Sequence, residues 1–253
     1  MTRIRMIIQY DGTQYVGWQV QPNGLAVQEV VQRELKKLTG EEIILHASGR
    51  TDSGVHARAQ VAHFDTSSRI PPDKFCYALN AGLARDIRIM YSGAAEGFHA
   101  RFDVTRKHYR YTIQNSQHAG VFTRSTALHI HYALDMAHMQ AAAEMVLGEH
   151  DFAAFKAAGA EVESTIRRIY RSQWSKEGSL LHYDVAGSGF MYNMVRILVG
   201  TMIDIGMGRC GADVINAALS SGRREDAGPT APPHGLTLWR VEYSDFDTED
   251  YII

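Results

Sequence analysis

The stretch GRTDSGVHARAQ, residues 49–60, holds the side chains of this sequence that are best suited to chemistry. Its single carboxylate, Asp52, stands close to Arg50 and Arg58, and apolar, β-like runs flank the stretch on both sides. Aspartate, serine and glycine are also common turn residues, so a turn alone would explain their presence. The two nearby arginines and the position between strands, where a rigid scaffold often presents reactive groups, also make Asp52 a candidate catalytic residue.

A second candidate, Arg196, lies within an apolar helical pattern at residues 191–202. A guanidinium stays charged, so in a buried helix it needs either a carboxylate partner or a water-filled cleft. The pattern equally allows the stem of Arg196 to extend to the surface. If its partner is Asp52, the pair would hold that carboxylate ionised and aimed.

Aromatic and basic residues alternate in the stretch FHARFDVTRKHYRYTIQ, residues 98–114. On a strand, Tyr109 and Tyr111 share one face, while His108 and Arg110 share the other. Core packing is the ordinary role of a strand tyrosine, but aromatic rings beside basic groups also stack bases and neutralise phosphates. The candidate RNA contacts are the basic residues Arg58, Arg101, Lys107 and Arg110.

Histidines 46, 56, 63 and 99 surround the same region, and Asp52 with His56 and His63 would be the ligands of a metal-dependent hydrolase. Their spacing matches no established ligand pattern, and scattered histidines are usually structural. The sequence also has no phosphate-binding loop and no dinucleotide fingerprint. We therefore expect neither a metal nor a small-molecule cofactor.

Composition places the chain among ordinary globular proteins, with 253 residues, 45% of them hydrophobic and 21% charged. The two cysteines lack the spacing of a zinc or redox site, so a reducing cytoplasm is the simplest setting. The amino terminus does not resemble a secretory signal, and charged residues interrupt the most apolar later segment, so we expect no membrane span.

The net charge of −2 includes four acidic residues in the tail, residues 245–253. The rest of the chain has 26 basic against 24 acidic residues, so a basic surface must come from local clustering. A disordered end is the ordinary expectation for such a tail, although its aromatic residues and terminal isoleucines offer groups for docking.

Strands and helices in both halves of the chain must position these side chains. The expected strands are 3–10, 42–47, 60–65, 87–91, 108–114, 165–175, 179–186 and 236–243. The expected helices are 25–38, 72–83, 135–147, 190–205 and 212–220. Their hairpin-like connections favour an α+β fold with antiparallel sheet. We predict two similar halves, 1–115 and 116–244, followed by the acidic tail 245–253.

Several ordered blocks of the sequence resemble the bacterial tRNA pseudouridine synthases of the TruA family, over almost the whole chain. The blocks are YDGTQYVGWQVQ (10–21), GRTDSGVHARAQVAHFDT (49–66), NAGL (80–83), FHARFDVTRKHYRYTI (98–113), GFMYNMVRILVGTMIDIG (189–206) and APPHGLTLWRVEY (231–243). The sequence departs from the family pattern at Ser53, where alanine is common, and at Asn193, where histidine is frequent.

The resemblance implies a role for four residues. Asp52 is the catalytic residue, and Arg50 enters the RNA helix and helps to hold the target nucleotide outside the stack. Tyr109 contacts the flipped base, and Arg196 pairs with the aspartate. The implied reaction converts uridine to pseudouridine in the anticodon stem-loop of tRNA, at positions 38–40, without a cofactor.

The resemblance also implies an assembly. Two RRM-like, or ferredoxin-like, halves would join their antiparallel sheets across a central catalytic cleft. The chain would act in the cytoplasm as a homodimer in which one tRNA touches both subunits. The sequence leaves two alternatives open, the metal-dependent hydrolase and a tRNA-binding module without catalysis. A binding module, however, has no use for a carboxylate that faces bound RNA and repels phosphate.

Overall fold

The computed structural model describes residues 1–159 and 162–252, and the chain divides into two compact units. Unit 1 combines Met1–Thr105 with Thr237–Ile253, and unit 2 is Arg106–Leu236. The sequence instead predicted a boundary at 115 and a last strand in the second half. The difference arises because the last strand, β10 (Leu236–Tyr243), pairs in parallel with a strand of unit 1 through Thr237 and Leu238.

The strands of unit 1 form a sheet in the order β4-β1-β3-β10, with β2 paired to β3. These strands are β1 (Thr2–Tyr10), β2 (His46–Ala47), β3 (His56–Thr66) and β4 (Ile87–Ala94). All pairs other than β3 with β10 are antiparallel. Only the end of the strand expected at 42–47 forms, so the prediction was too long there.

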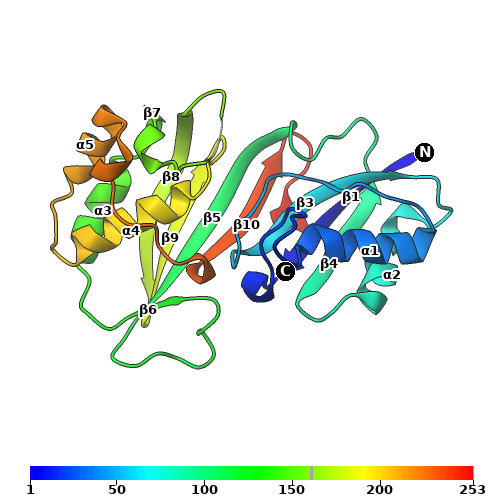
Figure 1. The fold of residues 1–253 in the computed structure, drawn as a ribbon, viewed down its shortest axis with the longest axis horizontal. Coiled ribbons are helices and arrows are strands. Elements are labelled where there is room, and N and C mark those ends of the chain that lie inside the picture. Colours follow the sequence, from blue (N-terminus) through cyan, green and yellow to red (C-terminus); the bar gives the residue numbers. More distant parts are fainter. Residues whose placement is uncertain (160–161, 253) are drawn as a thin grey trace. The chain divides into compact units, whose positions relative to one another are not determined.

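Two helices, α1 (Val27–Thr39) and α2 (Phe75–Gly82), lie side by side over one face of this sheet (Figure 1). The apolar stripe of α1 is buried, and Gly40 ends the helix in the left-handed conformation at φ 76°, as its position predicts. On α2, the ring of Phe75 packs edge-on against Phe64 of β3, with ring centroids 5.4 Å apart. Hydrophobic burial at this face therefore holds the sheet of unit 1 in place.

Unit 2 has strands in the order β5-β9-β8-β7. They are β5 (Val104–Asn115), β7 (Gly148–Asp151), β8 (Ile166–Glu177) and β9 (Leu180–Gly187), and a short β6 (Leu128–Ile130) runs parallel to β5. The other pairs are antiparallel, and the predicted hairpin between β8 and β9 turns at Gly178 with φ 59°.

The helices of unit 2 are α3 (Met136–Glu144), α4 (Met194–Gly206) and α5 (Val214–Ser221). Asp135 caps α3 by accepting the N–H groups of Ala137 and His138. Short 3-10 turns occur at Gly12–Gln14, Pro72–Lys74, Ala153–Phe155, Arg224–Asp226, Pro233–Gly235 and Thr248–Tyr251. The fold is thus mixed α+β with mostly antiparallel strands, which confirms the predicted class.

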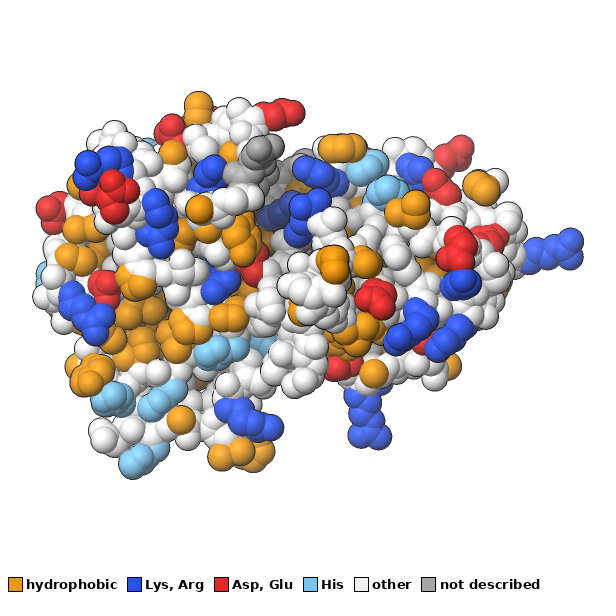
Figure 2. Space-filling model, viewed as in Figure 1, with side chains coloured by type: hydrophobic (Ala, Val, Ile, Leu, Met, Phe, Trp, Pro, Cys, Tyr) orange, Lys and Arg blue, Asp and Glu red, His pale blue; other side chains and the backbone are white. Residues whose placement is uncertain are grey.

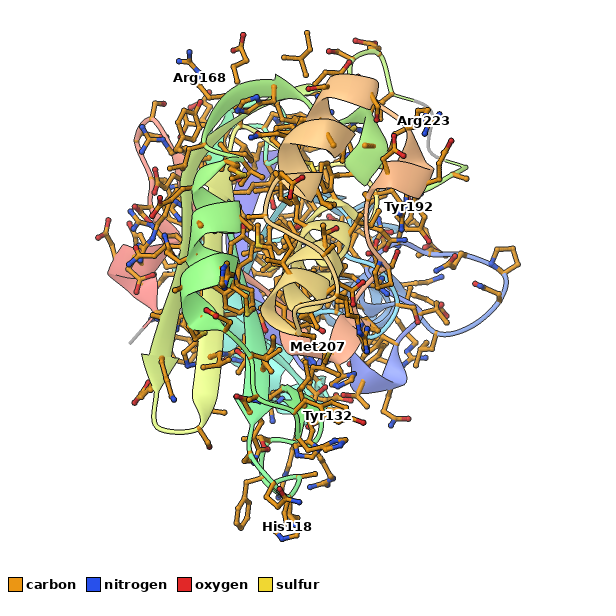
Figure 3. The ribbon with its side chains drawn as sticks, turned by 90° about the vertical axis from the view of Figure 1, so that its left-hand side faces the viewer. His118, Tyr132, Arg168, Tyr192, Met207 and Arg223 are labelled. Atoms are coloured by element: carbon orange, nitrogen blue, oxygen red, sulfur yellow. The ribbon has the colours of Figure 1, made fainter. Side chains whose placement is uncertain are left out.

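One segment of unit 2 is prominent at the surface. Residues 116–133 project from its strands, with His118 at the far end (Figure 3). This segment carries Phe122 at 97% exposure and Val121 at 68%, and histidine side chains gather over it in Figure 2.

Within the described ranges, no helix has both the length and the apolarity needed to cross a membrane.

The acidic tail is ordered and packs on unit 1, contrary to the expectation of a disordered end. Phe246 and Ile252 are each only 5% exposed, and a 3-10 turn at Thr248–Tyr251 lies between them. The aromatic residues and isoleucine named in the sequence as docking groups therefore pack against the unit that also holds Asp52.

Candidate active site

Asp52 lies in the loop that joins β2 to β3, half-buried, while the side chain of Arg50 is exposed. The N–H of Val55 donates to the carbonyl of Asp52 at 3.1 Å, and Gly54 follows with a positive φ of 76°. Asp52 is therefore part of a tight turn, as its residue types indicate. The turn explains the path of the backbone, but the role of the carboxylate depends on the groups around it.

The segment 10–18 holds this loop by hydrogen bonds on both sides of Asp52. The hydroxyl groups of Tyr10 and Thr51 form a buried hydrogen bond of 2.7 Å. The N–H of Trp18 donates to the carbonyl of Thr51 at 3.1 Å, and the N–H of Gly54 donates to the carbonyl of Tyr15 at 3.3 Å. Burial makes such bonds costly to break, so the backbone at Asp52 is firmly positioned.

Two glycines allow the segment 10–18 to come this close. A Cβ at Gly12 would stand 2.1 Å from the carbonyl oxygen of Val55, and one at Gly17 would stand 2.5 Å from that of Thr51. Gly17 also has a φ of 105°, which L side chains rarely adopt. These positioning residues were not predicted, although the glycines of YDGTQYVGW were the available signal.

The opposite end of the loop is tied to β3. Gln60 is fully buried, and its amide donates to the carbonyl of Gly49 at 2.8 Å. The hydroxyl of Ser48 donates to the amide oxygen of Gln60 at 2.7 Å. Arg50 therefore leaves a fixed backbone with its side chain exposed, a suitable arrangement for contact with a large substrate.

In unit 2, Tyr109 lies on β5 and is 8% exposed. Its ring packs edge-on against Phe190, with centroids 5.3 Å apart. Tyr111 shares this face and donates its hydroxyl to the carbonyl of Pro232 at 2.9 Å, and burial raises the pKa of that hydroxyl. The alternation predicted for β5 is confirmed, because Arg110 on the other face binds Asp184 through two bonds of 2.8 and 3.0 Å.

The remaining candidate RNA contacts lie in different environments. Arg58 donates to the carboxylate of Glu249 at 2.9 Å, so this arginine has an acidic partner within unit 1. Arg101 is exposed, with its guanidinium 5.8 Å from the ring of Phe102, and Lys107 is half-buried on β5. Their contacts with RNA stay predictions.

Arg196 is half-buried on α4 and is oriented from two directions. Its Nε donates to the carbonyl of Ala231 at 2.8 Å, and its Nη1 donates to the amide oxygen of Asn193 at 2.7 Å. Asn193 has a φ of 60° and is the one non-glycine with a positive φ among the described residues. Asparagine tolerates this conformation well. Asn193, where the sequence departs from the family pattern, therefore begins α4 and also orients Arg196.

Asp52 and Arg50 belong to unit 1, whereas Tyr109 and Arg196 belong to unit 2. Each unit presents its own side chains in a defined geometry. The pairing of Asp52 with Arg196 stays a prediction.

His56 and His63 on β3 each accept a backbone N–H group. The Nδ1 of His56 accepts the N–H of Gly12 at 3.0 Å, and the Nδ1 of His63 accepts the N–H of Ala100 at 3.1 Å. Burial, with a contribution from Arg3, lowers the pKa of His63 to about 4. Across residues 1–159 and 162–252, no group of three or more His, Cys, Asp or Glu side chains has an arrangement that could hold a metal ion.

Comparison with known proteins agrees with the resemblance of the sequence blocks. The sequence model of the tRNA pseudouridine synthase family matches residues 6–103 and 142–244. A protein named tRNA pseudouridine synthase A from Ruminiclostridium cellulolyticum is 48% identical over 245 residues, which cover 96% of this chain and all of that protein. Proteins of the same name from Geotalea uraniireducens and Bacillus pumilus are 46% and 45% identical over 244 residues each.

Those two alignments cover 96% and 95% of this chain, and 100% and 99% of the two relatives. The similarity therefore extends across both units and includes the loop of Asp52 and helix α4. The chain belongs to the tRNA pseudouridine synthase family and is an isomerase that modifies tRNA.

Proposed function

We propose that this isomerase acts on uridines 38–40 in the anticodon stem-loop of tRNA and that Asp52 is its catalytic residue. The observation that carries the proposal is the firm positioning of Asp52. Hydrogen bonds that Tyr10 and Trp18 form with Thr51, and that the carbonyl of Tyr15 accepts from Gly54, hold the loop on both sides of this carboxylate, in a chain of the tRNA pseudouridine synthase family. Such preorganisation is what a reacting group needs and what a simple surface turn does not require.

The reaction breaks the bond between the ribose C1′ and N1 of uracil, turns the base and joins C1′ to C5. C5 loses a hydrogen and N1 gains one, so the isomerisation is balanced without an oxidant or reductant. A uridine in a stem must first leave the base stack, which costs a few kcal/mol. Arg50, exposed beside the fixed loop, would fill the vacated space and offset part of this cost.

Asp52 has three chemically reasonable roles. Its carboxylate would trap the positive charge that develops at C1′, as in retaining glycosidases. It would alternatively remove the proton from C2′ or attack C6 of the base. All three roles need an ionised acid at a fixed position.

The partners in unit 2 supply charge and stacking. Arg196 would keep the carboxylate ionised, because an opposite charge favours the charged form. Its bonds to Ala231 and Asn193 already orient the guanidinium. Tyr109 would stack on the uracil and assist the final proton transfer from C5.

The test replaces Asp52 by asparagine, which keeps the shape and removes the charge. We expect pseudouridine formation in a tRNA transcript to fall by about 1,000-fold or more, while tRNA binding persists. Asp73→Asn is the matched control, because it makes the same change at an exposed position of unit 1. Substantial activity in folded Asp52→Asn protein would exclude the catalytic role.

We further propose that the two units are RRM-like halves joined across a catalytic cleft and that the chain acts in the cytoplasm as a homodimer. Each unit supports this fold by combining antiparallel strands with helices. Sedimentation equilibrium tests the dimer, for which we expect about twice the chain mass of 28.2 kDa. A single chain mass at all working concentrations would contradict it.

A further inference from the structure

The tail, defined here as residues 245–252, lies beyond the family match, which ends at residue 244. It turns back on β10 through the bond from the N–H of Tyr243 to the carbonyl of Phe246 at 2.8 Å. The buried hydroxyl of Thr248 then accepts the N–H of Val241 at 3.0 Å and donates to its carbonyl at 3.2 Å. The tail is thus fastened to the last strand of unit 1.

The tail covers the face of the unit 1 sheet that lies opposite α1 and α2. We call this the helix-free face. Phe64 packs on α2 and pairs with Ile4, so Arg5 and Ile7 point to the helix-free face by alternation along β1. Tyr91 lies on the same face because it pairs with Ile7. The guanidinium of Arg5 lies over the ring of Phe246, 3.6 Å from the ring centroid. Tyr251 packs on Tyr91 with ring centroids 4.3 Å apart.

Acidic groups of the tail bind arginines of β3 and β10. Glu249 accepts from Nη1 of Arg58 at 2.9 Å, and the carbonyl of Ile252 accepts from Nη2 of the same residue at 3.2 Å. Asp247 accepts from Nε of Arg240 at 2.9 Å. The tail thus contacts Arg58 with a carboxylate and a main-chain carbonyl, whereas Arg240 is shared between Asp247 of the tail and Glu242 of β10.

Arg58 also lies over an aromatic ring, with its guanidinium 5.0 Å from the ring of Trp239. A guanidinium beside an aromatic ring is the combination that neutralises a phosphate and stacks a base of single-stranded RNA. The carboxylates of Glu249 and Asp247 stand where phosphates would bind, and the rings of Phe246 and Tyr251 stand where bases would stack.

We propose that the acidic tail is an intramolecular substitute for RNA, which covers a basic and aromatic RNA-binding face of unit 1. The tail suppresses unselective RNA binding by competing with phosphate for Arg58 and Arg240. Charge supports this, because the tail changes the chain from a balance of 26 basic against 24 acidic residues to a net charge of −2. The inference depends on RNA as the substrate class, but its test does not use the reaction.

The experiment measures the affinity of the full chain for an oligoadenylate of about twelve nucleotides, which contains no uridine and spans about one binding face. We expect Glu249→Gln to bind about 3- to 10-fold more tightly at low salt, with a larger gain for Glu249→Gln combined with Asp247→Asn. Asp250→Asn is the matched control. It removes the same charge from the tail, but Asp250 forms no ion pair with the residues that the structure describes.

A second substitution separates a specific face from a general change in charge. Arg58→Ala added to Glu249→Gln should cancel the gain in affinity, because it removes the guanidinium that the tail releases. Equal affinities for Glu249→Gln and Asp250→Asn would overturn the proposal, as would a gain that persists without Arg58. A lower melting temperature with unchanged RNA affinity would show a purely structural tail and would also overturn it.

Discussion

The two units position their functional side chains by different means. In unit 1, the short side chain of Asp52 extends from an irregular loop that is held by backbone bonds and close contacts with two glycines. In unit 2, the longer side chains of Tyr109 and Arg196 extend from a strand and a helix. Their positions follow from regular elements, with local bonds as a final adjustment.

The proposed roles of these side chains require the backbone to be positioned with different precision. A carboxylate that must approach a reacting carbon cannot compensate for a shift of its own backbone, because aspartate has only two side-chain torsions. An arginine or tyrosine reaches further and tolerates small shifts. We therefore expect unit 1 to be more sensitive to changes in backbone packing, and four predictions test this.

Among these four, the largest effect is expected from Gly12→Ala. The added Cβ would meet the carbonyl oxygen of Val55 at 2.1 Å, so the loop must move. We expect a loss of more than about 3 kcal/mol in the free energy of unfolding and about 100-fold in activity, measured by chemical denaturation and pseudouridine formation. Gly40→Ala, where a Cβ meets nothing within 4 Å, should cost only about 1 kcal/mol for its positive φ, with little effect on activity.

Acid should weaken unit 1 through His63. Its pKa is lowered to about 4 in the folded chain, so the unfolded state binds the proton more readily between pH 6.5 and pH 4. The contribution of neutral His63 to the free energy of unfolding is complete above pH 6.5. It is lost as the pH falls from 6.5 to 4, a decrease of about 2 to 3 kcal/mol. Hydrogen exchange at β1 and β3 should show the loss. His63→Asn should flatten the pH dependence, and an unchanged profile would contradict this role for His63.

In unit 2, Arg196→Lys tests the planar guanidinium. Lysine keeps the charge but cannot bind Ala231 and Asn193 in the same geometry. We expect activity to fall about 10-fold, mainly in kcat, with little change in the melting temperature. A larger loss than that of Gly12→Ala would reverse the predicted order of the two units.

The smallest effects come from a matched pair of hydroxyl deletions. Tyr10→Phe removes the bond to Thr51 in unit 1, and Tyr111→Phe removes the bond to Pro232 in unit 2. Each should cost about 1 kcal/mol of stability. Only Tyr10→Phe should also lower activity several-fold, because, of these two bonds, only the one to Thr51 contacts the loop of Asp52. Equal activity losses would show that the two units are equally sensitive.

Elements with strong local patterns were predictable from the sequence. The apolar spacing of α1, its glycine stop and the cap at Asp135 all appear as expected. The expected strand at 42–47 is shorter because side chains of α1 bind its backbone. The amide of Gln28 donates to the carbonyl of Leu45, and the N–H of Leu45 donates to Gln32. These groups are then unavailable for a strand ladder.

Errors at other elements have similar local causes. Strand β7 (Gly148–Asp151) was missed because GEHD has no apolar alternation. Helix α4 begins later than expected because Asn193 adopts a left-handed conformation. The tail was expected to be disordered because its partners, among them Arg5 and Arg58, are distant in the sequence. Composition describes a segment but not the surface on which it folds.

The candidate site was predictable only in part for the same reason. The residue types and family blocks predicted roles for Asp52, Arg50, Tyr109 and Arg196, and these roles stay predictions. Tyr10, Gly12 and Gly17 together form a clamp on the loop of Asp52. This clamp depends on contacts across about 40 residues and on main-chain carbonyls, which leave no pattern in residue types.

The clamp has a consequence for how the chain folds. The bond between Tyr10 and Thr51 joins positions 41 residues apart, and the bond between Ser53 and Tyr15 spans 38. Such contacts close a long loop, which costs entropy before they stabilise anything. Helices α1 and α2 can form early from local contacts, but the loop of Asp52 gains its shape only when β1 and β3 have paired. The loop of Asp52 should therefore be among the last parts of unit 1 to form during refolding.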